Sequence, residues 1–286
     1  MFKKVAAFTL ATALILGVST PQINFAEEGI VKKDKFDKEA YNSKEEVKLA
    51  KKLQKMSEKE IKKEQKSLSK QIKGLTDSEL DRFMFNFVKD NYQSDEQMTE
   101  NLKLLDIEFA KKKKGKDKQV SITGMNPADI DLSIFSYKRG TEGWYSIQSN
   151  WETFGGELSI GTLDLVSIEW DPNVGNYYTV AVPDDRITTK KDGTNRLNGI
   201  YLFNVRDAFF NFDSYAVVRV TPKKFNTKFH YATKYTHTFS VTDTSSTGSS
   251  SFQFTNSGFT AGYSYSVTKQ TGIDDWDIFD DNDVTF

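Results

Sequence analysis

From Val120 to the end of the chain, apolar and polar residues alternate with a period of two. Successive side chains of a strand point to opposite faces, so this alternation predicts half-buried strands. Eight segments fit the pattern: residues 130–138, 143–151, 163–171, 176–182, 199–205, 214–221, 235–243 and 259–268. Turn residues bound these segments, and no helical pattern alternates with them. The order predicts an antiparallel β-sandwich of the jelly-roll-like class with about 8–10 strands.

Before residue 119 the apolar residues recur at helical spacing. Ser43, Thr76 and Ser94 each have Glu or Gln three positions later, which is the capping-box pattern at the start of a helix. Apolar residues follow each of these starts, and the third series extends to Phe109. Gly74 is a candidate for the end of the first helix.

The change of period divides the chain into two parts. Residues 27–118 are predicted to form a charged region of about three helices that ends in a lysine-rich linker at 111–118. Residues 119–286 are predicted to form the sandwich, so the fold class is α+β.

Residues 1–26 have the pattern of a secretory signal peptide. Lys3 and Lys4 precede an apolar run at 5–18 that is too short to span a membrane, and cleavage is expected after Ala26. The sequence therefore predicts a secreted, extracellular protein.

Composition narrows the function classes further. The chain has 0 cysteines, which excludes disulfides, cysteine zinc sites and thiol nucleophiles, and which in an exported protein is typical of bacterial secretion. Residues 27–118 carry 24 Lys/Arg and 20 Asp/Glu (24 − 20 = +4), and residues 119–286 carry 13 and 20 (13 − 20 = −7). Neither part has the basic stripe of a nucleic-acid-binding protein, so nucleic acid is not an expected partner.

Aromatic and amide residues in 143–151 suggest a ligand face. Its odd positions, among them Tyr145 and Trp151, are apolar, so the even positions are expected to face water. Trp144, Gln148 and Asn150 would then form a surface for stacking and hydrogen bonding to a sugar. The alternative interpretation places Trp144 under a neighbouring loop.

The segment 235–267 permits a second interpretation. Its two arms, 235–243 and 259–267, alternate between aromatic and Ser/Thr positions, and each is close to the length of about 9–11 residues that crosses a bilayer as a strand. This pattern is typical of the inserting hairpin in β-barrel pore formers, with Phe252 and Phe254 near its tip. An ordinary hairpin with one face on the sandwich core shows the same alternation.

Metal binding and catalysis have weaker support. The acidic tail 274–283 suggests a calcium site with Asp274, Asp275 and Asp277 as first ligands, although it fails the EF-hand pattern and a solvated turn also explains it. The next candidate calcium ligands are Asp280, Asp281 and Asp283.

The candidate catalytic acids are Glu152, Glu157, Glu169 and Asp171, which lie in or beside strands, as paired acids do in glycosidases. His230 and His237, seven residues apart, would face opposite sides of one strand.

The sequence thus predicts a secreted, non-catalytic protein that binds an extracellular polysaccharide or the cell envelope through its sandwich. The first alternative is a membrane-active pore former that uses the 235–267 hairpin. An extracellular glycoside hydrolase is the third interpretation. No cofactor is expected apart from the calcium ion considered for the acidic tail.

Overall fold

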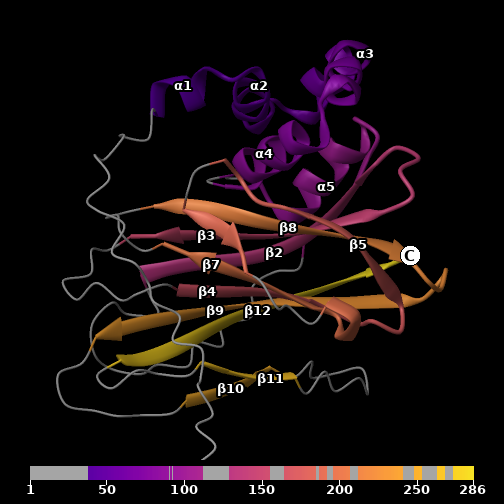
Figure 1. Cartoon of the computed structure of the whole chain (residues 1–286). Helices are drawn as coiled ribbons and strands as arrows, with labels where there is room; N and C mark the ends of the chain where they lie inside the picture. The colour runs from indigo at the N-terminus through magenta and orange to yellow at the C-terminus, as the bar shows by residue number, and fades with distance from the viewer. Residues whose placement is uncertain are drawn as a thin grey trace, which may run out of the picture. The chain divides into compact units, whose positions relative to one another are not determined.

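The alternating segments form strands, and the segments of helical spacing form helices (Figure 1). The computed structural model describes residues 38–89, 91, 93–111, 129–154, 164–184, 187–191, 196–206, 212–240, 248–252, 263–267 and 273–286. The expected signal peptide, and the expected linker apart from Lys111, lie outside these residues.

Five α-helices are present among the described residues: α1 (Lys38–Ser43), α2 (Glu45–Gln54), α3 (Glu58–Gly74), α4 (Asp77–Val88) and α5 (Asp95–Lys103). The predicted capping boxes at Thr76 and Ser94 are confirmed, and α3 ends at Gly74 as predicted. The start predicted at Ser43 is wrong, because Ser43 ends α1 and Lys44 precedes α2 without a side-chain cap. The predicted first helix is also broken, since Ser57 caps α3 with a capping box of its own.

Two five-stranded antiparallel sheets make up the β part. Sheet A has the order β1 (Ile107–Ala110), β2 (Ile130–Arg139), β3 (Tyr145–Thr153), β8 (Asp213–Pro222) and β5 (Gly175–Ala181). Sheet B has the order β12 (Ile273–Thr285), β9 (Lys228–Ser240), β4 (Asp164–Trp170), β7 (Ile200–Val205) and β6 (Thr188–Lys190). The helical assignment of Phe109 is wrong, because α5 ends at Lys103 and Phe109 pairs with Tyr137 of β2.

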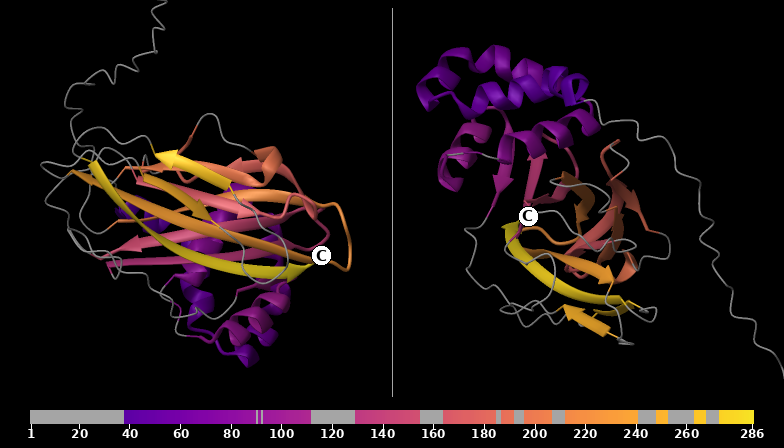
Figure 2. Two further views of the ribbon diagram at one scale, coloured as in Figure 1. Left: turned by 90° about the horizontal axis from the view of Figure 1, so that it is seen from below. Right: turned by 90° about the vertical axis from the view of Figure 1, so that its left-hand side faces the viewer.

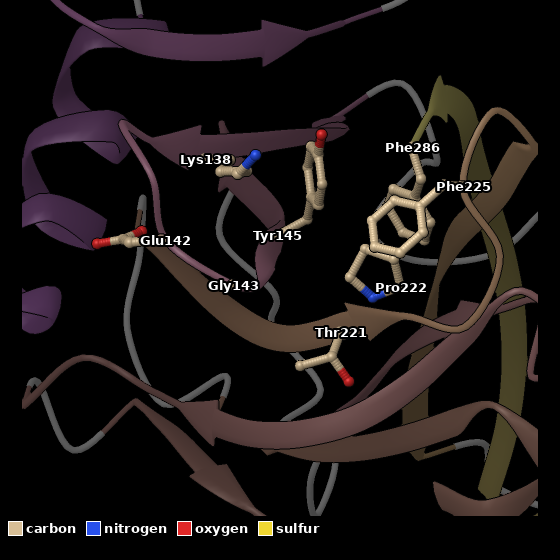
Figure 3. A pocket seen from close by; sticks show the side chains of 8 residues that line it. All are labelled: Lys138, Glu142, Gly143, Tyr145, Thr221, Pro222, Phe225 and Phe286. Carbon is tan, nitrogen blue, oxygen red and sulfur yellow. The ribbon is translucent and has the colours of Figure 1, made fainter.

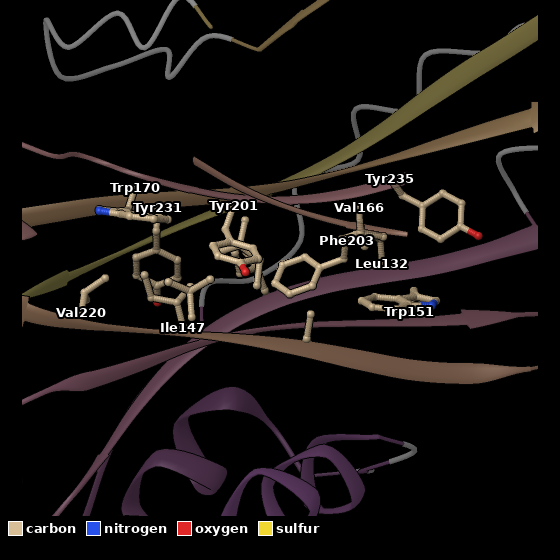
Figure 4. Close-up of a cluster of buried hydrophobic side chains, with 14 of the residues drawn as sticks. Leu132, Ile147, Trp151, Val166, Trp170, Tyr201, Phe203, Val220, Tyr231 and Tyr235 are labelled. Atoms are coloured by element: carbon tan, nitrogen blue, oxygen red, sulfur yellow. The ribbon is translucent and has the colours of Figure 1, made fainter. Parts of the chain in front are cut away.

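A single hydrophobic core joins the two sheets (Figure 4). Sheet A contributes the odd residues of β3, including Ile147 and Trp151, as the alternation predicts. Sheet B contributes Trp170, Phe203 and Tyr235 from its central strands. Because both sheets bury one face against this core, the arrangement is that of a sandwich.

The helices cover the face of sheet A that is turned away from sheet B (Figure 2). The apolar sides of α2–α5 form a second core with β1 and with Phe135 and Tyr137 of β2. On α4, Phe85 packs on Tyr215 of β8, with ring centroids 5.0 Å apart. None of the helices in the described part of the chain is long and apolar enough to cross a bilayer.

A buried ion pair fastens α4 to sheet A. Nη2 of Arg219 on β8 donates to both carboxylate oxygens of Asp81 at 2.8 Å, and the hydroxyl of Tyr137 donates to the same carboxylate. Burial raises the pKa of Asp81, although Arg219 and Tyr137 oppose the shift. Removing either charge would leave the other buried without its partner, which is costly in the interior.

The hairpin predicted at 235–267 has a different pairing. Strand β9 pairs along its length with β12, so Tyr235 lies opposite Ile278 rather than opposite the predicted return arm. The return arm contributes β11 (Tyr263–Val267), which pairs with β10 (Gly248–Phe252) in a separate two-stranded sheet that contacts β12 (Figure 1).

Candidate functional site

The predicted ligand face is divided between an exposed edge and a buried interior. Gln148 and Asn150 are 0 % and 6 % exposed, because the helices cover this face of sheet A, so the prediction that they face water is wrong. Gln148 donates to Asn150 at 2.9 Å, while Oε1 of Gln148 and Nδ2 of Asn150 have no hydrogen-bond partner among the described residues. Trp144 immediately precedes β3 and stacks on Tyr178, with ring centroids 5.2 Å apart. Their use as one binding surface stays a prediction.

Tyr178 owes its position to a bulge in β5. Tyr177 pairs with Val220 and Thr179 with Arg219, so Tyr178 is the extra residue of the bulged strand. A bulge re-aims the side chain that it carries, and Tyr178 remains 53 % exposed beside Trp144.

The Trp144–Tyr178 pair lies at one end of the sandwich, which we call the Phe225 end. It comprises the β2–β3 turn (140–144), the β4–β5 connection (171–174), the 3-10 helix η2 (Arg196–Asn198), the β8–β9 loop (223–227) and the C-terminal Phe286. Three of the five most exposed large apolar side chains of the described residues lie here: Tyr178, Leu197 (88 % exposed) and Phe225 (75 % exposed). Exposed apolar residues that gather in one place mark interaction surfaces.

The first of two cavities at this end has aromatic walls (Figure 3). It has a volume of about 250 Å³, and its walls include Tyr145, Phe225 and Phe286. The Tyr145 ring lies 4.7 Å from that of Phe286, and Lys138 Nζ lies 5.1 Å above the Tyr145 ring. The Tyr145 hydroxyl donates to Glu108 at 2.7 Å, and burial together with this carboxylate raises the pKa of Tyr145. An apolar floor with a charged rim suits an amphipathic ligand.

The second cavity, of about 230 Å³, lies on the other side of the β8 terminus. Arg196, Lys223 and Asn176 line it, and Leu197 stands at its edge. Strand pairing brings these distant residues together, because Asn176 of β5 lies opposite Thr221 at the end of β8. Sequence reasoning missed this group, although the loop Lys223-Lys224-Phe225 between two strands is a visible signal for it.

Cations without acidic partners surround the exposed apolar residues. Arg196, Lys223 and Lys224 are exposed, and none of them takes part in a salt bridge among the described residues. Lys228 is instead paired with Asp283 at 3.1 Å. These three exposed cations lie together at the Phe225 end, although residues 119–286 carry a net negative charge (13 − 20 = −7).

Ionisable groups of a different kind lie on the outer face of sheet B. Glu169 of β4, Lys234 of β9 and Asp277 of β12 share this face, and Lys234 Nζ lies 3.7 Å from Asp277. Burial raises the pKa of Glu169 to about 7, against the opposing effects of Ser167 and Lys234. Burial also lowers the pKa of Lys234 and raises that of Asp277.

The acidic tail forms a strand, so the solvated-turn interpretation is wrong. Residues 273–285 are β12, in which Asp274 lies opposite Phe239 and Asp275 opposite Thr238, and the carboxylate of Asp277 lies 3.7 Å from Lys234 Nζ. Asp280 accepts a hydrogen bond from the backbone of Ile134. Within the described ranges, no three acidic or histidine side chains gather as a metal site would require.

Asp281 and Asp283 lie on β12 opposite Ala232 and His230. Asp283 is engaged by Lys228.

The candidate catalytic acids lie apart. Glu152 faces α4, where Lys89 contacts it at 3.1 Å, whereas Glu169 lies on the outer face of sheet B. Asp171 accepts a hydrogen bond from the backbone of Asn173, and Glu157 lies outside the described residues. The two histidines occupy opposite faces of β9, as predicted.

His237 is fully buried beside Trp276, with Nδ1 at 3.1 Å from both carboxylate oxygens of Asp164. This pairing supplies two groups of a catalytic triad, but complete burial leaves His237 without access to a substrate. His230 is partly exposed. Its partial burial lowers its pKa, and the positive charge of Lys228 lowers it further.

Of the two predicted insertion residues, only Phe252 lies among the described residues. Phe252 is the last residue of β10 and lies opposite Tyr263 of β11, while Phe254 lies outside the described residues. The register pairs Ser249 with Ser266 and Ser251 with Ser264.

Comparisons with known proteins add no relative to this description. No protein-family model matches the chain, and no curated protein matches it either.

Proposed function

We propose that this protein is a non-catalytic module that docks reversibly on an anionic lipid surface through its Phe225 end. The observation that carries the proposal is Phe225 itself, which is 75 % exposed and follows the two exposed cations Lys223 and Lys224. Leu197 repeats the arrangement beside Arg196. Apolar tips flanked by cations bind membranes by combining burial in the interface with attraction to anionic headgroups.

In this proposal the sandwich is the scaffold that supports the loops of the Phe225 end. We propose the jelly-roll-like class for the sandwich, which holds the loops of the Phe225 end on rigid strands. The signal-peptide pattern of residues 1–26 and the absence of cysteine support secretion by a bacterial cell and an extracellular site of action.

The magnitudes predict weak binding. Burying Phe225 and Leu197 would contribute about 1.5–3 kcal/mol each. The three cations would add about 1 kcal/mol each near an anionic surface. Immobilising the protein offsets part of this sum, so we expect binding in the micromolar range or weaker. We also expect it to fall with salt, because the screening length shortens to about 3 Å at 1 M.

The test is sedimentation of the purified protein with vesicles. We expect binding to phosphatidylcholine vesicles that contain phosphatidylglycerol, and much less to phosphatidylcholine alone. Phe225→Ser should abolish binding without loss of stability. Phe154→Ser is the matched control, because Phe154 is 59 % exposed and follows the last residue of β3, at the other end of the sandwich. Equal loss in both variants, or no binding by the unaltered protein, would contradict the proposal.

Sedimentation with cell-wall polysaccharide in place of vesicles tests the polysaccharide interpretation. Binding to cell-wall polysaccharide that is lost in Trp144→Ala, with no binding to vesicles, would identify the Trp144–Tyr178 pair as a sugar platform instead.

Membrane insertion by the two-stranded sheet is a second candidate function, favoured by the register of β10 and β11. Two alternate register pairs are serine with serine, Ser249–Ser266 and Ser251–Ser264, and the remaining pairs are Gly248–Val267, Ser250–Tyr265 and Phe252–Tyr263. Strands with one polar and one apolar face are what a membrane barrel requires.

Because the chain has 0 cysteines, a single cysteine at Ser250 or Ser251 gives a unique site for an environment-sensitive dye. Insertion predicts leakage of trapped dye from vesicles and a blue shift at position 250 but not at 251. Equal spectra at the two positions, or binding without leakage, would contradict insertion.

A further inference from the structure

The second cavity of the Phe225 end has the chemistry of an anion site. Two cationic side chains, those of Arg196 and Lys223, and the amide of Asn176 line a space of about 230 Å³, and none of the described residues that line it carries a carboxylate. The acid of the neighbouring β4–β5 connection, Asp171, is buried and accepts a hydrogen bond from the backbone N–H of Asn173 at 2.8 Å. A small anion would therefore meet donors of hydrogen bonds without a competing acid among the described residues of the cavity wall.

Stacking on an aromatic ring fixes the position of the Arg196 side chain. Its guanidinium lies 5.3 Å above the ring of Tyr177, a cation–π contact that leaves the N–H groups at its edge available. The Tyr177 ring is itself stacked on Tyr201 at 5.9 Å and on Trp170 at 6.3 Å, and Trp170 is fully buried. The sandwich core thus sets the position of an otherwise exposed arginine.

Two hydrogen bonds to the β4–β5 connection fix the position of Lys223. Its backbone N–H donates to the carbonyl of Val174 at 2.7 Å, and its ammonium group donates to the carbonyl of Pro172. A lysine ammonium has three donors, so two remain for a ligand in the cavity. Leu197 and Phe225, the exposed apolar residues beside these cations, mark the side from which a lipid surface would approach.

We propose that this cavity is a phosphate subsite, in which Arg196 and Lys223 bind the phosphate group of a membrane lipid. The inference rests on the proposed docking of the Phe225 end and names the headgroup chemistry that it recognises. A phosphate monoester is preferred, because its second negative charge matches the second cation, and its oxygens accept charge-assisted hydrogen bonds from arginine and lysine. The subsite should therefore distinguish membranes of equal surface charge whose lipid phosphate groups carry different charges.

The test compares two double variants with the same change in charge. Arg196→Gln with Lys223→Gln removes both cations of the cavity, whereas Lys224→Gln with Lys228→Gln removes Lys224 of the same end and the adjoining Lys228, which pairs with Asp283, and neither of these lines the cavity. Binding is measured on phosphatidic acid vesicles and on phosphatidylserine vesicles of matched surface charge. We expect the cavity variant to lose about tenfold per cation on phosphatidic acid, the usual effect of losing a charge-assisted hydrogen bond. The control variant should lose equally on both lipids.

Soluble probes make the outcomes distinguishable. Inorganic phosphate and glycerol phosphate should shift the backbone amide signals of Gly175 and Asn176 in NMR spectra of the unaltered protein but not of the cavity variant. If both double variants lose vesicle binding equally while Phe225→Ser still abolishes it, the docking stands and the subsite is overturned. If soluble phosphate binds but vesicles do not, the docking fails and the lipid source of the phosphate is overturned.

Discussion

Replacing Glu169 by Gln tests the buried ionisable face of sheet B. The Glu169 side chain is 1 % exposed, and burial raises its pKa from 4.5 to about 7 in the folded protein. Between these values the folded state holds a proton that the unfolded state has released, so stability falls as pH rises through this window. Below 4.5 both states are protonated, and above about 7 both are ionised, so the effect is absent at low pH and complete at high pH.

The interval from 4.5 to about 7, at about 1.36 kcal/mol for each pH unit, amounts to about 3 kcal/mol. Glutamine does not titrate, so Glu169→Gln should gain about this much relative to the unaltered protein as pH rises from 4.5 to 7. The pKa of about 7 already includes the opposing effect of the charge of Lys234. Urea denaturation at a series of pH values measures the free energies of unfolding.

Glu64→Gln is the matched control for this experiment. Glu64 lies on α3, its side chain is 46 % exposed, and it pairs with Lys52 at the surface. Its profile should run parallel to that of the unaltered protein. If the Glu169→Gln profile also runs parallel, burial does not raise the pKa of Glu169 and the reasoning fails.

Three further substitutions test the fold and its exposed end. Asp81→Asn should lower the free energy of unfolding by about 3–5 kcal/mol, because it removes the close ion pair of buried Arg219 and leaves it only the 4.0 Å contact with Asp77. A second Arg219→Met change should restore part of this in a double-mutant cycle, and additive losses would contradict the pairing. Gly199→Ala should cost at least about 1–3 kcal/mol, since φ is +76° and a Cβ would lie 2.1 Å from a backbone carbonyl; Gly143→Ala, with open space around it, is the control in thermal denaturation. Trp144→Ala should cost only about 0.5–1.5 kcal/mol for its lost stack, and a far larger loss would show a core role.

Local patterns predicted most of the elements. Thr76 and Ser94 begin helices because a capping box needs only residues that are three positions apart. The alternation in 143–151 correctly placed Tyr145 and Trp151 in the core, since one buried face fixes the register of a strand. The jelly-roll-like class stays a prediction, because strand order depends on contacts between distant segments.

The errors arise where tertiary packing decides. Gln148 and Asn150 occupy the polar face of a strand, and nothing within the strand shows that α4 covers it. The sequence of β12 resembles a solvated turn because five of its first nine residues are acidic. The core positions Trp276 and Ile278 lie between these acidic residues. Arg196 and Lys223 are neighbours only because β8 ends beside β5 and η2.

The distribution of exposed apolar groups connects the fold with the proposed function. Helices cover the outer face of sheet A, and on the outer face of sheet B Glu169 and Lys234 are buried while Phe279 is 42 % exposed. Phe225 remains exposed in the β8–β9 loop and Leu197 in η2, and both contribute little to stability because they bury little surface on folding. Their replacement should therefore leave the free energy of unfolding nearly unchanged, in contrast to half-buried Tyr177 and buried Trp170, which support the neighbouring cations. This separation makes the Phe225 end the part of the described molecule where binding can be changed without changing the fold.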